Sequence, residues 1–350
     1  MPKKKPSNII TISDLWKYKH LTVTWFARAA LKLVLNRDII PPPSIDEIKV
    51  FYEKISEFID EERERLSKRN IDICTIIPLP LTRNDPKDKF NVCSALAMLN
   101  RVLMGEETKY STLTPALSLE FTERTRSFLG PWKLKRDYIV INDDALALAI
   151  LGAYLTRSYV VKNEYCYVFI DTYLTDIDTF VSINKFGRMI TNQVINLGDG
   201  SLDTAIVAIA LRMAVDDIVM NEISRSGYSL VTMVRIMRTG NRVILKSFDL
   251  VEIANLAALL KRLKIPYTVL NLVRNYPTKD EVSKDPRLAR YKRYVESLSR
   301  NILKYYWLGD PVYLYDIVRP LYMETIVESI KTRLGEQADK VIEGLKSIVW

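Results

Sequence analysis

The chain has 350 residues, enough for one large domain or two of ordinary size. Hydrophobic residues make up 48% of it and charged residues 27%, the composition of a folded protein rather than a disordered one. Lysine and arginine number 51 against 42 acidic residues, so the formal net charge is +9. Such an excess favours a polyanionic partner, although many enzymes of basic pI never touch nucleic acid.

Other features of the composition narrow the class of protein. The longest uncharged apolar run, residues 145–155, is about half of what a membrane-spanning helix needs, so we expect a cytoplasmic protein that does not enter a membrane. Cys74, Cys93 and Cys166 are widely spaced and odd in number, which predicts three buried thiols and no disulfide framework. Because glutamine and histidine are scarce and Glu, Lys, Arg and Ile are plentiful, we expect a thermophilic source.

The first part of the chain is predicted to be mostly helical. A capping box formed by Ser44 and Glu47 begins the second of its helices, and Gly105 follows the third. Apolar spacing predicts helices over residues 13–36, 44–69, 90–104 and 144–156. A short strand is expected at residues 73–77.

The middle of the chain turns to β character before a long buried helix. Strands are predicted over residues 159–161, 165–173 and 179–184. Residues 201–225 then form a helix that is apolar on nearly every side and should lie in the core. The clearest local signal is a β-hairpin, in which residues 229–238 and 242–248 are joined by Thr239-Gly240-Asn241. A helix over 249–264 and a strand over 267–273 are expected after it.

Past Pro277 the pattern becomes wholly helical. Helices are predicted over residues 285–308, 312–334 with a kink at Pro320, and 336–350. The sequence therefore predicts an α+β fold. The first domain, residues 1–277, would be mixed: helical over 1–157, then β-rich and helical over 158–277, where the hairpin, the sheet and the buried helix lie. A helical C-terminal domain, residues 278–350, would follow.

Few residues are suited to catalysis. His20 is the one histidine, no paired Cys-x-x-Cys is present for zinc, and no glycine-rich phosphate-binding loop occurs, so we expect no metal, no cofactor and no enzymatic activity. An alternative is a Mg²⁺-dependent nuclease, because Asp171, Asp176 and Asp178 lie on or just after predicted strands. These aspartates can equally be turn residues.

Basic residues gather on the predicted hairpin. Arg235, Arg238, Arg242 and Lys246 surround a tip that contains Asn241. A two-stranded ribbon fits a nucleic-acid groove, where arginine or asparagine can contact base edges. The alternative is an ordinary hairpin whose cations face solvent.

A second basic surface is predicted on the helix over residues 285–308. At 100° per residue, Arg290, Arg293, Arg300 and Lys304 fall on one side of the helix. The opposite side is apolar, with Leu288, Tyr291, Val295, Leu298, Ile302 and Tyr305. A row of cations without acidic residues favours phosphate binding, and the alternative is a surface that serves solubility.

Two segments carry a resemblance to a known family. They are residues 145–217 and the unit Met-Val-Arg-Ile-Met-Arg-Thr-Gly-Asn-Arg-Val-Ile-Leu-Lys-Ser-Phe at 233–248 with its following helix. Their order resembles the large subunit of the archaeal subtype I-A CRISPR interference complex (Cascade), which serves antiviral defence. The resemblance implies a non-catalytic subunit that contacts guide RNA and target DNA, helps to recognise the protospacer-adjacent motif, and stabilises the opened target.

The resemblance also implies a set of partners. The other Cascade backbone and small subunits would surround this chain, and a recruited helicase-nuclease would perform the cleavage. No motif-reading residue is transferred from the family to a position in this chain. The sequence thus predicts a nucleic-acid-binding subunit of an RNA-guided complex, against the alternatives of a nuclease or a structural or adaptor protein, for example of an archaeal virus.

Overall fold

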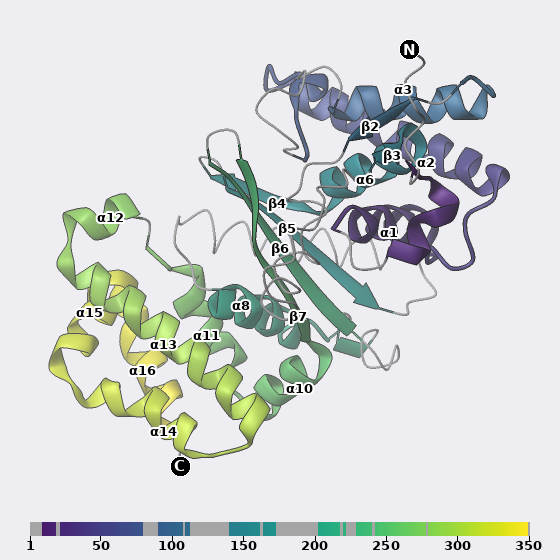
Figure 1. The fold of residues 1–350 in the computed structure, drawn as a ribbon. Coiled ribbons are helices and arrows are strands. Elements are labelled where there is room, and N and C mark those ends of the chain that lie inside the picture. Colours follow the sequence, from purple (N-terminus) through teal and green to yellow (C-terminus); the bar gives the residue numbers. More distant parts are fainter. Residues whose placement is uncertain are drawn as a thin grey trace, which may run out of the picture. The chain divides into compact units, whose positions relative to one another are not determined.

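The structure is a computed structural model, and it has the mixed α+β architecture predicted from the sequence, with a helical C-terminal region (Figure 1). The residues that it describes are 9–18, 22–79, 90–107, 109–112, 140–161, 164–172, 202–217, 220–221, 229–239, 242–277 and 279–348. Contacts divide the chain into two compact units. The first comprises residues 1–157, 162–167 and 234–248, and the second 158–161, 168–233 and 249–350. The boundary predicted near Pro277 thus falls inside the second unit.

The first unit is built around two helices that pack closely. Its helical elements are η1 (Ile12–Tyr18), α1 (Thr22–Leu35), α2 (Ile45–Ser67), η2 (Ile73–Thr75), α3 (Val92–Leu103) and α6 (Asp143–Thr156). Helix α6 packs against α1 and α3, and it is apolar all round and buried along most of its length, as a central helix must be. Gly152 permits the close crossing, since a Cβ there would lie 1.8 Å from the carbonyl oxygen of Phe26.

A small sheet accompanies these helices. Strand β3 (Val140–Asn142) lies between β1 (Ile9–Ile10), with which it is parallel, and β2 (Tyr110–Thr112), with which it is antiparallel. None of these three strands was predicted from the sequence. Two or three residues are too few to show the alternation of apolar and polar side chains by which strands are predicted.

The larger sheet has the strand order β4-β5-β6-β7. Its strands are β4 (Arg157–Val161), β5 (Glu164–Thr172), β6 (Ser229–Thr239) and β7 (Arg242–Glu252). The predicted hairpin is confirmed, because β6 and β7 are neighbours of 11 residues each. Strand β7 continues to Glu252, so the helix predicted from residue 249 begins later, at Ala254. The glutamate carboxylate accepts hydrogen bonds from the backbone N–H groups of Ala254 and Asn255 and thereby caps that helix.

The second unit encloses a buried helix. Helix α8 (Leu202–Ala214) contacts three helices that come later in the chain, α10 (Ala254–Arg262), α11 (Pro266–Arg274) and α13 (Pro286–Leu308) (Figure 1). The prediction of a core helix is confirmed for these residues, and much of the predicted continuation to 225 lies outside the described residues. The remaining elements are α12 (Lys279–Lys284), α14 (Val312–Val318), η3 (Arg319–Tyr322), α15 (Glu324–Leu334), η4 (Gly335–Gln337) and α16 (Ala338–Lys346).

Two predicted strands are helical in the structure. Residues 73–75 form the 3-10 helix η2, whose N-cap Asp72 accepts a hydrogen bond from the backbone N–H of Cys74. Residues 267–273 belong to α11, which begins at Pro266. Proline at the first position suits a helix start, and the apolar side chains at 269, 270, 272 and 273 are buried together. The β-branched residues of both segments favour strands, but this preference is weak, and the packing of the surrounding structure makes both segments helical.

Two predicted helices are divided. Residues 13–36 contain η1 and then α1, which begins at Thr22. In place of a kink at Pro320, α14 ends at Val318, the turn η3 follows, and α15 begins at Glu324. Proline has no N–H to donate and its ring crowds the preceding turn, so a full interruption replaces a bend.

The prediction for the cysteines was wrong. Cys74 and Cys93 form a disulfide with Cα atoms 5.3 Å apart, and only Cys166 is a buried free thiol among the described residues. The disulfide joins η2 to the first turn of α3. A separation of 19 residues on the chain gave no sign that these two elements meet in space.

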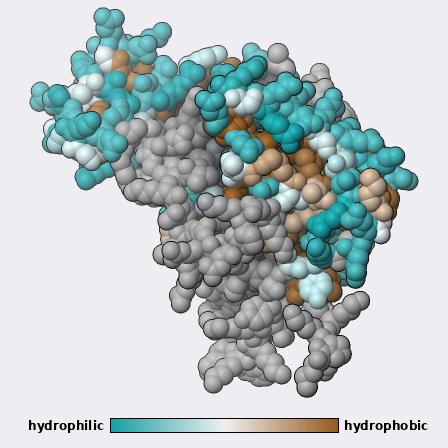
Figure 2. Space-filling model, turned by 90° about the horizontal axis from the view of Figure 1, so that it is seen from above, coloured by the Kyte–Doolittle hydropathy of each residue, from teal (hydrophilic) through white to brown (hydrophobic). Residues whose placement is uncertain are grey.

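The described part of the face shown in Figure 2 is largely polar. On the face seen in Figure 2, most described residues are hydrophilic and hydrophobic residues show between them. Within the described part of the chain, no helix combines the length and the apolar character required to cross a bilayer.

Candidate nucleic-acid interface

Helix α13 presents the basic surface predicted for the C-terminal region. Its start is fixed by Asp285, which accepts a hydrogen bond from the backbone N–H of Arg287, and by Pro286 at the first helical position. Its end is set by Gly309 in the left-handed conformation, with φ +70°. Between them 23 residues form a helix about 35 Å long.

One face of α13 is anchored in the second unit. Tyr291, Val295, Leu298 and Ile302 are buried, as predicted. The hydroxyl of Tyr291 donates a hydrogen bond to the carbonyl oxygen of Leu272 at 2.7 Å. The hydroxyl of Tyr294 donates a hydrogen bond to the carbonyl oxygen of Ile317 at 3.1 Å. These contacts fix the rotation of α13 about its own axis and so determine which side chains face outward.

The four predicted cations all face outward. Arg290, Arg293, Arg300 and Lys304, here called the cation stripe, are exposed and lie within about 80° of one another around the helix. The placement predicted from the sequence is therefore confirmed, whereas the binding of phosphate by these residues stays a prediction.

The cations of the stripe are only lightly engaged. Arg300 Nε lies 3.5 Å from Asp203 Oδ2, and Lys304 Nζ lies 5.3 Å from the ring centroid of Tyr313. Among the residues that the structure describes, no carboxylate forms an ion pair with Arg290 or Arg293. Most of the positive charge of the stripe is therefore accessible to a polyanion.

The acidic residue nearest to the stripe on α13 is engaged elsewhere. Glu296 accepts a hydrogen bond from the hydroxyl of Tyr276. Burial, together with this hydrogen bond, raises the pKa of Tyr276, so the phenol stays protonated and continues to donate. The other two described cations of α13 also have partners. Arg287 pairs with Asp285 at 3.0 Å, and Lys292 Nζ lies 5.5 Å from the ring centroid of Tyr276.

The hairpin cations that the structure describes have a shared partner inside the first unit. Arg235 Nη2 lies 2.6 Å from Oε1 of Glu164, and Lys246 Nζ lies 2.8 Å from its Oε2. Burial opposes ionisation of Glu164, but the hydrogen bonds from Lys246 and Arg235 outweigh it, and its pKa lies below the usual range. Asn241 and the side chains of Arg238 and Arg242 lie outside the described residues.

The carboxylates of the alternative nuclease are described only in part. Asp171 is buried in β5, while Asp176 and Asp178 lie outside the described residues. In the described ranges no group of three or more histidine, cysteine or acidic side chains is arranged to hold a metal ion. Asp217, also acidic and exposed, pairs with Lys261 at 2.5 Å.

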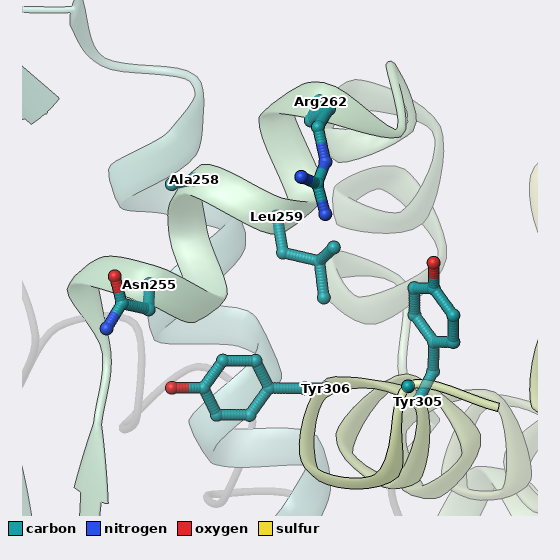
Figure 3. A pocket seen from close by; sticks show the side chains of 7 residues that line it. Asn255, Ala258, Leu259, Arg262, Tyr305 and Tyr306 are labelled. Carbon is teal, nitrogen blue, oxygen red and sulfur yellow. The ribbon is translucent and has the colours of Figure 1, made fainter.

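An open pocket, which was not predicted from the sequence, lies at the C-terminal end of α13. Its volume is about 440 Å³, and it is lined by α10 and α13 through Asn255, Ala258, Leu259, Arg262, Tyr305, Tyr306 and Gly309. Figure 3 shows Arg262 and Leu259 extending from α10 toward the two tyrosines. The hydroxyl of Tyr306 donates a hydrogen bond to the carboxylate of Glu252 at 3.2 Å. Burial, and secondly the negative charge of Glu252, raise the pKa of Tyr306. The described lining of the pocket thus offers one cation and two aromatic rings.

Comparisons with protein-family models, with curated proteins and with solved structures give no match for this chain. Among the described residues of the chain, the cation stripe is the feature best suited to binding a ligand.

Proposed function

We propose that the protein binds nucleic acid through the cation stripe of α13. The observation that carries this proposal is that Arg290, Arg293, Arg300 and Lys304 are exposed on one side of a helix whose opposite side is anchored. Guanidinium and ammonium groups bind phosphate oxygens, and the release of condensed counterions adds to the affinity. An outward helix face that serves only solubility commonly mixes charges of both signs, and this one does not.

In its fuller form the proposal places the protein in the cytoplasm as a non-catalytic subunit of a CRISPR RNA-guided surveillance complex. There it helps to recognise the protospacer-adjacent motif and to stabilise target DNA, beside guide RNA and the Cascade backbone and small subunits, and a recruited helicase-nuclease cleaves. The resemblance of residues 145–217 and 233–248 supports this form, and the cation stripe supports the contact with nucleic acid.

The salt dependence of binding tests the contact with phosphates. If the four cations of the stripe each meet one phosphate of a single strand, the affinity of the full chain for a labelled oligonucleotide falls about 50-fold between 50 and 200 mM salt. Removing two of them in Arg290→Ala/Arg293→Ala lowers the slope of log affinity against log salt by about 1.4. Fluorescence anisotropy measures both quantities.

A matched double variant controls for the loss of charge alone. Arg319→Ala/Lys340→Ala also removes two exposed cations of the second unit, but neither lies on α13. We expect it to keep the slope of the unmodified chain. An affinity that does not depend on salt, or an equal loss in both double variants, contradicts binding by the stripe.

Membership of the complex is tested separately. The chain is co-expressed with candidate backbone and small subunits and a guide RNA, purified through a tag on this chain, and the retained RNA is sequenced. Enrichment of guide RNA supports the fuller proposal. Recovery of this chain without the subunits, or retention of no RNA, contradicts it.

A further inference from the structure

The cation stripe ends at an exposed tryptophan. Trp307 is three residues beyond Lys304, and 59% of its surface is exposed. At 100° per residue it extends the stripe to about 100° of the helix circumference. Tryptophan is a large apolar residue that folded chains tend to cover, so its exposure beside a row of cations is an unusual arrangement.

Trp307 lies in the last turn of α13, and a second helix follows within a few residues. Gly309 ends α13 two residues later, and α14 begins at Val312, whose N–H donates to the carboxylate of Asp310. Tyr313 of α14 lies beneath Lys304. The ring of Trp307 is therefore carried on the last turn of an anchored helix and not on a long loop.

We infer that the nucleic acid held by the stripe is single-stranded, and that one of its bases stacks on the ring of Trp307. This inference rests on the proposed function, to which it adds the class of nucleic acid. A single strand exposes both phosphates and the flat faces of its bases, whereas a duplex hides those faces in its own stack. From Arg293 to Trp307 the helix rises about 21 Å, long enough for several nucleotides to lie along it.

Charge favours this occupant over an apolar protein surface. Leu308 and Tyr315, which are close to Trp307 in the chain, are also exposed, so an apolar protein surface is the alternative occupant. A purely apolar partner that covered Trp307 would also desolvate the adjacent cations of the stripe without compensation, which is costly. A nucleotide strand satisfies both the cations and the ring.

The experiment compares two polymers that differ only in their bases. Affinities of the full chain are measured by anisotropy for a 20-nucleotide thymidine strand and for a strand of the same length made of abasic sites. We expect Trp307→Ala to weaken binding of the thymidine strand about tenfold and to leave the abasic strand unchanged. Trp307→Phe should retain most of the affinity, because it keeps an aromatic face.

The controls separate this inference from the proposal beneath it. Trp16, 40% exposed in the first unit and paired with Lys17, provides a matched substitution, Trp16→Ala, which should affect neither polymer. Arg293→Ala/Arg300→Ala should weaken the binding of both polymers. If the unmodified chain binds neither polymer, the proposed function fails. If the unmodified chain binds both polymers but Trp307→Ala changes neither affinity, the stacking inference alone is overturned. The same holds if a duplex of equal length binds more tightly than the thymidine strand. The exposed apolar side chains near Trp307 would then serve a protein partner.

Discussion

Arg235 on β6 and Glu164 on β5 form an ion pair in which Nη2 lies 2.6 Å from Oε1. Lys246 on β7 contacts the other oxygen of the same carboxylate, so three neighbouring strands share one charge cluster. These two cations were predicted to contact nucleic acid. Because both cations pair with Glu164, they stabilise the sheet, and α13 is the better candidate for contact with nucleic acid.

The charge cluster predicts a loss of stability when Glu164 is neutralised. Glu164→Gln leaves two cations facing an uncharged amide, and we expect the free energy of unfolding at pH 7 to fall by about 2 kcal/mol. Urea denaturation measures this change. Glu61→Gln, at an exposed position on α2, should change it by less than about 0.5 kcal/mol and serves as the control.

The difference in stability between the unmodified chain and Glu164→Gln should depend on pH in a definite direction. The pKa of folded Glu164 lies below its ordinary value of 4.5, so its contribution to stability is complete above that value and is lost as pH falls through the folded pKa. The difference between the unmodified chain and Glu164→Gln should therefore shrink as the pH is lowered below 4.5. A difference that grows on acidification contradicts this assignment.

The disulfide between Cys74 and Cys93 predicts sensitivity to reductant. Closing a loop of about 20 residues restricts the unfolded chain, and its removal should cost about 3 kcal/mol. A reductant should lower the melting temperature of the unmodified chain and leave Cys74→Ser/Cys93→Ser unaffected. Alkylation after denaturation without reductant should modify one thiol, Cys166. Modification of three thiols contradicts the disulfide.

The crossing of α1 and α6 predicts an intolerant glycine. In Gly152→Ala the new Cβ meets the backbone oxygen of Phe26, which cannot rotate away, so we expect a loss of about 3 kcal/mol or more. Gly344 provides a graded control, because a Cβ there meets the side chain of Thr268 at 2.8 Å, and that side chain can adjust. Gly344→Ala should change stability by about 1 kcal/mol or less. Thermal denaturation of both variants tests the difference.

The start of α2 predicts a smaller effect. Ser44 Oγ accepts a hydrogen bond from the N–H of Glu47, and the Glu47 carboxylate accepts one from the N–H of Ser44. Ser44→Ala should lower stability by about 1 kcal/mol. Ser67→Ala, at the other end of the helix, should have a weaker effect, since the Ser67 hydroxyl donates to the carbonyl oxygen of Glu64 within the same helix and caps no free N–H group. Equal losses at the two ends contradict the capping role.

The features predicted well from the sequence are those with local causes. The capping box at Ser44, the hairpin of β6 and β7, and the two faces of α13 each follow from residues only a few positions apart. The cation stripe belongs to this group, because periodicity along one helix fixes which side chains share a face.

The features that the sequence did not reveal depend on distant residues. The partnership of Glu164 with Arg235 spans 71 residues, and the pairing of β1 with β3 joins Ile9 to Val140. Segment 267–273 has β-branched residues but is helical, since its environment in the second unit outweighs that weak preference. Trp307 was visible in the sequence, but only the structure shows that its ring is exposed beside the stripe.

The position of α8 has a consequence for how the chain is made. Its seven residues from Ala205 to Leu211 are buried, yet α10, α11 and α13, which cover it, are all encoded downstream. A ribosome adding 5 to 20 residues per second needs roughly 4 to 14 s to pass from the end of α8 to the start of α13. During that interval the apolar residues of α8 are without three of the helices that bury them in the folded chain, so the nascent protein carries an unprotected apolar segment until its C-terminal helices have been made.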